Sequence, residues 1–555
     1  MKKILKHTIA IITAIIFLAG CSEDLLNEEP PHIITTTTLY TSYNGFQSGL
    51  NGLYSLVRQD YEGEDGSANY LRIEMWMNGT DNMTSNHRDG FARVAENWEN
   101  NNSTYDRITN NFYWLYRIVN AANTIIIHAE DDGVDWTGGS QSPEENKNSV
   151  VAHARAIRGW AYRYLTFGWG AVPLNLNEAL GSEVKTDWER TPVSEVRAQI
   201  IQDWEFAEQH IGIEPEYQGR ITKGAIQHYL AEMYLAENNP TKALEWANKC
   251  INTPDYQLIT ERYGVRSDQE GVPFMDMFYD GNSNRYQGNT EALWVFPFEF
   301  EVIGGSGSIM RRWHISRYES ATFAGKRNAL KITAERGGRA RARMSLTKWA
   351  IDNYEEGDDR FSNYAIRKFF ILKTAEENGA AGADVLPDGY AYGDTVWNDW
   401  SEDISSSNRN VTNWPFSRKW DYGYDLDLTD GFQYNDLVYL RLAETYLLKA
   451  EAQLLLDDKP GAATTLNIIR ERSNASPITA ADVDIDFILD ERSRELAAEE
   501  SRRITLLRTG KWLERTRAHN HNGGETVRDI DVLFAIPQDV IDANLTMPME
   551  NNPGH

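Results

Sequence analysis

Apolar residues recur with helical spacing in four long stretches of the chain. The first two cover residues 110–129 and 150–170, where apolar side chains return every three or four positions. This period places them on one face of an α-helix, so both stretches are predicted to be helices packed against a core. The second helix is expected to end where Gly-Ala-Val-Pro-Leu follows it.

The other two helical stretches resemble each other. "AEMYL" (231–235) and "AETYL" (443–447) each lead through a polar turn with a Pro into a second helix, which carries Ala243 or Ala463. Two helices joined in this way, with small residues where they meet, are typical of a tetratricopeptide-like hairpin. The copies are not separated by a regular 34 residues, so the array is predicted to be interrupted by insertions.

The largest insertion covers residues 255–435. It is rich in Gly and Asn, contains few long helical patterns, and has short strand candidates at 292–300 and 363–372. The predicted fold is therefore mostly α: a tetratricopeptide-like helical-hairpin scaffold with a large loop-rich insertion containing short strands. Because binding groups concentrate on loops held by rigid elements, the insertion is the expected ligand-binding part.

The N-terminus has the layout of an exported lipoprotein. Residues 1–20 combine three lysines with a short apolar run, and "LAGC" places Cys21 at the cleavage position. This predicts a signal peptide, lipid on Cys21, and a polar tether over 21–38 that holds the protein at a membrane surface. Ordinary signal-peptide cleavage beside an incidental Cys is the alternative.

The mature chain is predicted to form one integrated body. A helical part at 39–254 precedes the insertion, and helical repeats with a C-terminal segment fill 436–555. Cys250 is the only thiol besides Cys21, so no internal disulfide is expected, and its place in a helical pattern predicts a core position.

Charge limits the choice of partner. The formal net charge is −27, which argues against a nucleic-acid ligand because phosphates repel an acidic surface. Hydrophobic residues make up 41% of the chain, enough for a substantial core.

Eight stretches carry a resemblance to a known family. In chain order they are 154–174, 219–236, 289–298, 349–360 ("WAIDNYEEGDDR"), 436–455, 466–475, 491–512 ("ERSRELAAEESRRITLLRTGKW") and 536–555. Together, and behind the lipoprotein signal, they resemble the SusD/RagB family of outer-membrane nutrient-binding lipoproteins.

The resemblance implies a function at the cell surface. A family member is expected to capture an oligosaccharide, a polysaccharide or a peptide and to pass it to a SusC-like TonB-dependent outer-membrane barrel that it caps. It also implies no catalytic residues and no cofactor. The ligand class is not implied, because arginines at 339–343 stand where the family commonly has polar, aromatic or Pro residues.

Positive charge is concentrated in one segment of the insertion. Residues 311–348 hold eleven Lys or Arg and two Asp or Glu, a local charge of +9, which leaves −36 for the rest of the chain. In an extended "RARAR" stretch, Arg339, Arg341 and Arg343 would share one face. Such a row suits carboxylate or sulfate groups, hence a uronic or sulfated glycan. The alternatives are arginines paired with carboxylates or facing water or the barrel, with a neutral glycan such as a β-glucan or starch as ligand.

Aromatic and amide side chains are the second set of candidate glycan contacts. Sugar rings stack on Trp or Tyr while amides and guanidinium groups bind hydroxyls. The candidates fall in two loops: Arg88, Trp98, Asn100 and Asn101 in the first, and Trp313, His314, Arg317 and Tyr318 in the second. Core packing is the alternative for each tryptophan.

Catalysis and metal binding are weighed as alternatives. A helical glycoside hydrolase would need paired carboxylates, for which only adjacent residues offer themselves: Glu355/Glu356, Asp358/Asp359 and Glu499/Glu500. Residues 280–291 imitate a calcium loop but have Arg285 where the turn needs Gly, so no metal is expected. A repeat scaffold that binds only protein partners is the remaining alternative.

Overall fold

The computed structural model describes most of the chain. The described residues are 35–63, 70–85, 91–179, 185–403, 411–421, 428–429 and 431–555. Cys21, the signal peptide at 1–20, most of the tether and Arg88 lie outside these ranges, so the lipid anchor and the role of Arg88 stay predictions.

Long helices form the first part of the molecule. The helices before the insertion are α2 (Thr36–Leu39), α3 (Tyr43–Arg58), α4 (Glu74–Met77), α5 (Ala92–Asn97), α6 (Asp106–His128), α7 (Pro143–Trp169), α8 (Val193–His210), α9 (Lys223–Ala236) and α10 (Pro240–Ile251). The helices predicted at 110–129 and 150–170 are α6 and α7. Within the described ranges, no helix has both the length and the apolar character needed to cross a bilayer.

The longest helix shows why these elements begin and end where they do. Ser142 caps α7 and forms a capping box with Glu145, and Pro143 occupies the first turn, where its missing N–H costs nothing. The helix ends at Gly170, whose φ of +73° favours glycine.

The insertion contains short elements only. Its helices are α11 (Met310–His314), α12 (Lys348–Asp352) and α13 (Ala375–Asn378), and its strands are β2 (Ala292–Phe296), β3 (Thr322–Phe323), β4 (Lys326–Arg327), β5 (Ser345–Leu346), β6 (Ile366–Arg367), β7 (Phe369–Ile371), β8 (Thr395–Trp397) and β9 (Phe416–Ser417). In the described residues every sheet is a two-stranded antiparallel pair: β1 (Met83–Thr84) with β5, β2 with β10 (Leu437–Arg441), β3 with β4, β6 with β9, and β7 with β8.

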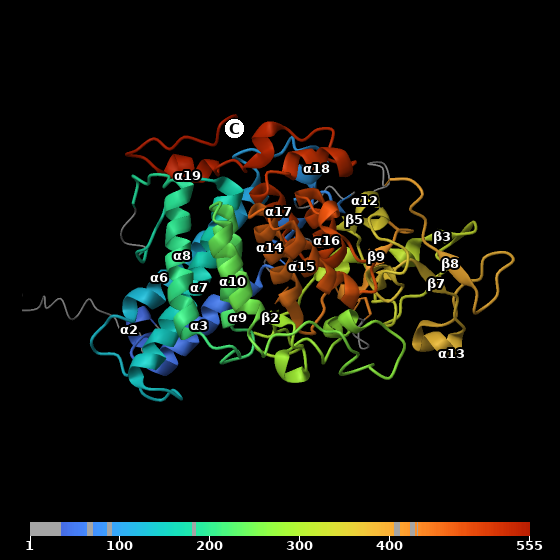
Figure 1. The fold of residues 1–555 in the computed structure, drawn as a ribbon, viewed down its shortest axis with the longest axis horizontal. Helices are drawn as coiled ribbons and strands as arrows, with labels where there is room; N and C mark the ends of the chain where they lie inside the picture. The colour runs from blue at the N-terminus through green and yellow to red at the C-terminus, as the bar shows by residue number, and fades with distance from the viewer. Residues whose placement is uncertain are drawn as a thin grey trace, which may run out of the picture.

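The C-terminal part returns to helices. They are α14 (Leu442–Leu455), α15 (Lys459–Arg472), α16 (Ile485–Leu496), α17 (Arg502–Arg508), α18 (Trp512–His519) and α19 (Gln538–Ala543). Figure 1 shows α14 and α15 beside α9 and α10, with β3, β7 and β8 of the insertion at the far end of the molecule.

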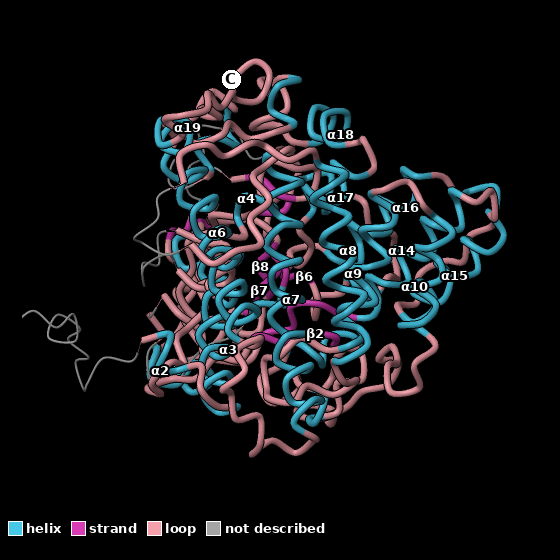
Figure 2. Tube along the Cα trace, turned by 90° about the vertical axis from the view of Figure 1, so that its left-hand side faces the viewer, coloured by secondary structure: helices cyan, strands magenta, loops and turns pink. Residues whose placement is uncertain are grey.

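Helical hairpins stack across the insertion. The pairs α7–α8, α9–α10 and α14–α15 each pack side by side, and α10 contacts α14 directly although about 190 residues separate them. Ala243 on α10 and Ala463 on α15 are both buried, as close approach of paired helices requires. The predicted interrupted array of hairpins is confirmed, and Figure 2 shows α10, α14 and α15 together on one side of the body.

One strand pair ties the insertion to the C-terminal helices. β2 pairs with β10, placing Phe296 opposite Leu437, and β10 runs directly into α14. The strand predicted at 292–300 thus exists but stops at Phe296, because Pro297 has no N–H for a further ladder bond.

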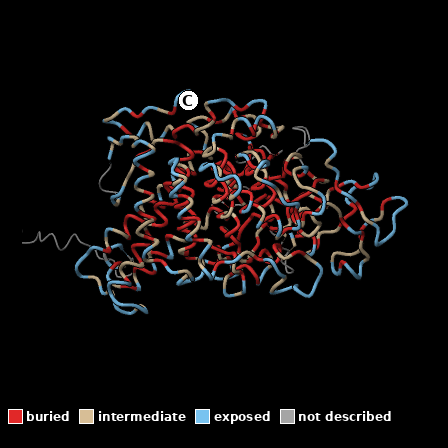
Figure 3. Tube along the Cα trace, in the orientation of Figure 1, coloured by how far each residue is buried: buried red, intermediate tan, exposed pale blue. Residues whose placement is uncertain are grey.

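A separate small core holds the far end of the insertion together. Tyr318, Phe323, Phe370, Val396 and Phe416 belong to this satellite core, which is distinct from the main one. Figure 3 shows the main body buried throughout its centre and the insertion loops exposed at the rim. The strand predicted at 363–372 appears as two short strands, β6 and β7.

Candidate functional site

Arginines of the insertion meet beside α11. The backbone N–H of Arg341 donates to the carbonyl of Arg312 at 2.7 Å, so the extended segment runs along the end of this helix. Arg339 is exposed and Arg341 half-buried, whereas Ala340 between them is buried. The predicted alternation of Arg outward and Ala inward therefore holds at 339–341.

Arg343 leaves this row. Ala342 has a φ of +51°, a left-handed conformation that breaks the alternation of an extended chain. Arg343 is consequently buried, with its guanidinium 5.1 Å from the ring centroid of Trp313. The prediction that three arginines share one face is wrong for Arg343, and residues 339–343 do not form a strand.

The electrostatics show that positive charge is concentrated here. Burial and, after it, repulsion from four neighbouring arginines together lower the pKa of Arg312 to about 10; the four are Arg341, Arg339, Arg343 and Arg311. A guanidinium pushed in this direction by its neighbours stands in a positive potential. Arg312 was not among the predicted contacts, although "MRRWH" places it directly before Trp313.

Among the residues that the structure describes, the Glu319 carboxylate lies within this group. Burial raises the pKa of Glu319, while Arg317 and Arg339 act to lower it. The Arg317 Nε lies 3.7 Å from Glu319 Oε1, beyond hydrogen-bond distance. We call Arg312, Arg317, Arg339 and Arg341 the arginine cluster.

The three aromatic rings predicted to stack on sugar are buried. Trp98, Trp313 and Tyr318 are each 0% exposed. Trp98 packs at 5.0 Å against Trp512, and the Tyr318 hydroxyl donates to the carbonyl of Gly338 at 2.9 Å. The expectation that these rings offer a free face is wrong, because long-range packing encloses residues whose sequence neighbours are polar.

The polar candidates have structural partners as well. His314 is buried and stacked on Trp420, and burial lowers its pKa to about 3, so the ring is neutral. Asn101 is buried and donates to the Asp531 carboxylate and the Leu533 carbonyl, both at 3.0 Å. Asn100 is half-buried and donates to the Arg93 carbonyl at 3.3 Å. None of these residues lies in the arginine cluster.

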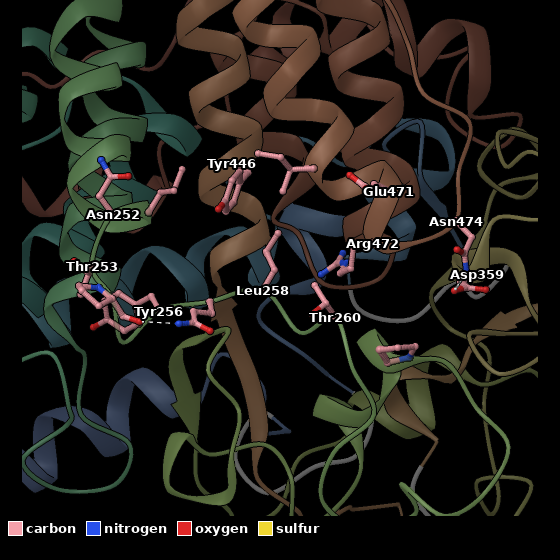
Figure 4. Close-up of a pocket in the computed structure, with 15 residues that line it drawn as sticks. Asn252, Thr253, Tyr256, Leu258, Thr260, Asp359, Tyr446, Glu471, Arg472 and Asn474 are labelled. Carbon is pink, nitrogen blue, oxygen red and sulfur yellow. Dashed lines mark hydrogen bonds between the residues drawn. The ribbon is translucent and has the colours of Figure 1, made fainter.

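A large groove lies between the helical hairpins, away from every predicted contact. It encloses about 780 Å³ between the end of α10, α14 and the end of α15. Figure 4 shows Asn252 and Thr253 on one side, Arg472 and Asn474 on the other, and Tyr446 between them. Amide, hydroxyl and charged groups around a half-buried tyrosine are the groups that bind sugar hydroxyls and rings. No local pattern predicted this groove, because its walls come from segments about 200 residues apart.

Each of the three carboxylate doublets has at least one member in an ion pair, with Glu355 bound by Arg470 in the first. Glu499 is bound by Lys419 and Arg441, and Asp358 is bound by Arg360. Glu500 contacts Arg492 at 2.7 Å and Arg502 at 3.4 Å. Burial acts to raise the pKa values of Glu499 and Glu500, but the neighbouring cations lower them overall. Carboxylates held ionised in this way do not suit the acid step of glycoside hydrolysis.

In the calcium-like loop at 280–291, the carboxylate at the last position binds other side chains of the protein. The carboxylate of Glu291 is bound by Arg441 and Arg472 rather than facing Asp280. Among the described residues, no group of three or more His, Cys, Asp or Glu side chains is placed to hold a metal ion. Cys250 is a core residue as predicted, and burial raises its thiol pKa to about 12.

Comparison with known families gives matches over both helical parts. A profile described as "SusD family" matches residues 344–555, and one described as "Starch-binding associating with outer membrane" matches residues 32–235. SusD-like protein P25 of Formosa agariphila is 23% identical over 536 residues, which cover 92% of this chain and 90% of that relative.

Solved structures share the fold. A SusD homolog from Bacteroides thetaiotaomicron has a TM-score of 0.70 at 17% identity, covering 94% of this chain and 98% of the other. A laminarin-binding SusD-like protein has a TM-score of 0.65 at 19% identity, covering 92% and 99%. Surface glycan-binding protein A from Bacteroides uniformis has a TM-score of 0.64 at 18% identity, also covering 92% and 99%.

Proposed function

The chain belongs to the SusD/RagB family, and on that premise we propose that it binds an oligo- or polysaccharide at the surface of the outer membrane without cleaving it. The proposal is supported by the profile described as starch-binding and associating with the outer membrane, which matches the first helical part. Relatives described as laminarin-binding or as surface glycan-binding proteins have the same fold. The ion-paired carboxylates support binding without turnover.

We propose further that the glycan is acidic. The observation that carries this is the gathering of arginines around Arg312, where repulsion from four neighbouring arginines adds to burial in lowering its pKa. An anionic group bound there would relieve the repulsion and accept charge-assisted hydrogen bonds from guanidinium forks. A uronic-acid or sulfated sugar has such groups.

The test is affinity electrophoresis with alginate and carrageenan. The double variant Arg339→Ala/Arg341→Ala is expected to bind at least tenfold more weakly, since a hydrogen bond to a charged group contributes about 1.5–3 kcal/mol. The matched control is Lys326→Ala/Arg327→Ala, which removes two exposed cations from β4 in the same basic segment. Wild-type binding should weaken as salt rises. Unchanged affinity in the arginine variant would defeat the acidic-glycan proposal.

A neutral glycan is the second candidate, and the groove between the hairpins favours it. Its lining offers Tyr446 as a stacking surface together with amides and hydroxyls. In this case laminarin binding should fall when Tyr446 becomes Ala, should be unaffected by the arginine substitutions, and should hardly depend on salt.

Lipid on Cys21 and delivery to a SusC-like barrel complete the proposal. The sequence Leu-Ala-Gly-Cys at 18–21, with Cys21 at the cleavage position, supports the lipid anchor. Membership of the family supports the barrel as a partner. Cys21→Ser should move the protein from the outer-membrane fraction to the soluble fraction. Detergent extracts of wild-type cells should yield the barrel together with a tagged copy of this chain, and recovery of the tagged chain alone would count against the partner.

The absence of turnover is also a proposal with a direct test. Incubation of the purified protein with laminarin, starch, alginate and pectin should release no reducing ends. Release that persists through repeated purification would identify a glycoside hydrolase instead.

A further inference from the structure

One tryptophan is set apart from all the others. The seventeen tryptophans all lie in the described residues, and Trp397 alone among them is exposed, at 56%. An indole left in water forgoes the free energy that its burial would contribute. Its exposure therefore calls for an explanation other than packing.

Trp397 lies on a short hairpin with a second ring beside it. In the antiparallel pair β7–β8, Phe369 stands opposite Trp397, and Ile371 stands opposite Thr395. The Phe369 and Trp397 ring centroids are 4.8 Å apart, with planes inclined at 55°. Ile371, on the same face because side chains alternate along a strand, is 44% exposed.

The other face of the hairpin is fixed in the satellite core. Phe370 and Val396 are opposite each other and buried, and the Phe370 ring lies 5.2 Å from that of Tyr318. Beyond the strands, the backbone N–H of Asn398 donates to the Lys368 carbonyl at 2.9 Å. The backbone that carries Phe369 and Trp397 is thus fixed by the buried face of the hairpin, and ligand binding would not have to order it.

The size of this surface decides what it fits. A stable protein interface buries about 800 Å² on each partner, from roughly 20–30 residues. Phe369, Ile371 and Trp397 form a much smaller apolar face, which matches a single sugar ring. Thr395, which shares a face with Trp397 because side chains alternate along the strand, is half-buried beside this face and offers a hydroxyl.

We infer that Phe369, Ile371 and Trp397 form a stacking subsite for the apolar C–H face of a pyranose ring. We call this the hairpin platform; Figure 1 shows β7 and β8 at the end of the molecule away from α7 and α8. The inference rests on the proposed glycan-binding function and names a contact for that function. It requires no charge on the sugar and does not depend on the arginine cluster.

The test uses the whole mature protein, with laminarin as a neutral probe and alginate as an acidic one. Trp397→Ala is expected to weaken binding of whichever probe wild type binds by about tenfold. Trp397→Phe, which keeps a ring, should stay within about threefold. The matched control is Tyr286→Ala, which removes an aromatic side chain that is 67% exposed elsewhere on the surface.

Fluorescence quenching gives a second readout, which can be measured on the wild-type protein without replacing the Trp397 side chain. Acrylamide should quench the exposed indole of Trp397 in free wild-type protein, and the bound probe should protect it. In Trp397→Phe the quenchable component and its protection should both disappear.

The outcomes separate this inference from the proposed function. If wild type binds a probe while Trp397→Ala binds it equally well and quenching is unchanged, the hairpin platform is overturned and glycan binding stands. If Trp397→Ala and Tyr286→Ala weaken binding equally, the platform is also overturned. If wild type binds no polysaccharide, the proposed function fails and the platform with it.

Discussion

Arginine side chains have two roles in this protein, and burial decides between them. In the arginine cluster the side chains are half-buried or exposed, and their positive charges repel one another. In the core, Arg360, Arg441 and Arg472 instead surround the carboxylate of Glu495, with Arg360 at 3.1 Å and Arg441 at 2.5 Å. Burial acts to raise the pKa of Glu495, but the three arginines outweigh it and hold the pKa well below its ordinary value.

Removing this carboxylate should destabilise the fold strongly. Glu495→Gln would leave three buried guanidinium groups without a shared counter-ion, because a neutral amide cannot replace the charge. We expect the free energy of unfolding to fall by about 3–5 kcal/mol, measured by denaturant titration followed by circular dichroism.

The control for this prediction is an exposed carboxylate of the same kind. Glu356→Gln changes an exposed side chain and should alter stability by no more than about 0.5 kcal/mol. Equal stability of the two variants would show that the buried network contributes little.

At the scale of elements, the hairpins pack closely where a glycine allows it. Gly159 of α7 faces Trp204 of α8, and a Cβ at this position would lie 2.6 Å from the indole nitrogen. That nitrogen donates to the Ala156 carbonyl at 3.0 Å, so the indole cannot shift without losing a buried hydrogen bond.

Two glycine-to-alanine substitutions should therefore change the free energy of unfolding in opposite directions. Gly159→Ala is expected to lower the free energy of unfolding by about 1–3 kcal/mol through overpacking. Gly52→Ala, in α3 with nothing within 4 Å of the added Cβ, should raise it by about 0.5–1 kcal/mol because Ala restricts the unfolded chain. Thermal unfolding of both variants measures the pair, and a loss in both would contradict the packing argument.

At the scale of the whole molecule, buried ionisable groups set how stability depends on pH. Burial lowers the pKa values of His153, His228 and His314 to about 3, so these rings are neutral in the folded state. Burial raises the pKa of Asp60 to about 7 and that of Glu74 to about 8, so these carboxyls are held protonated in mildly acidic solution.

The three histidines and the two carboxyls change stability with pH in opposite directions. Between about pH 4.5 and 6.5 the unfolded chain binds three more protons than the folded chain on the histidines and two fewer on the carboxyls. The net difference is one proton more on the unfolded chain. The contribution of these five groups to stability should therefore rise only gently with pH in this window, by about 1.4 kcal/mol per unit. Below about pH 4.5 the two carboxyls no longer oppose the histidines.

Ion-paired carboxylates make the acid side steeper. The pKa values of Asp81, Glu232 and Glu491 are lowered to about 2, since neighbouring arginines outweigh the effect of burial. Their contribution is present above pH 4.5 and is lost as the pH falls toward 2. Denaturant titrations from pH 3 to 8 should thus show a gentle slope that becomes steep below about 4.5.

A single substitution checks this balance. Asp60→Asn removes one of the opposing carboxyls, so the slope between pH 4.5 and 6.5 should become steeper than in wild type. An unchanged slope would show that Asp60 is ionised in the folded protein.

The sequence by itself determined the local elements and their order. Helical periodicity gave α6 and α7, the repeated turn gave the hairpins α9–α10 and α14–α15, and Pro297 set the end of β2. These features follow from the residues that form them, because spacing of apolar side chains, caps and prolines acts over a few positions. Cys250 was predicted as core for the same reason.

Only the tertiary structure decided which side chains reach the surface. Trp98 and Tyr318 have polar neighbours in sequence yet are enclosed by residues far along the chain, whereas Trp397 is exposed. Arg343 turns inward because of one left-handed residue, and the groove has walls from distant hairpins. Burial depends on contacts between segments hundreds of residues apart, which no local pattern records, so the sequence predicted the scaffold well and the exposure of individual side chains poorly.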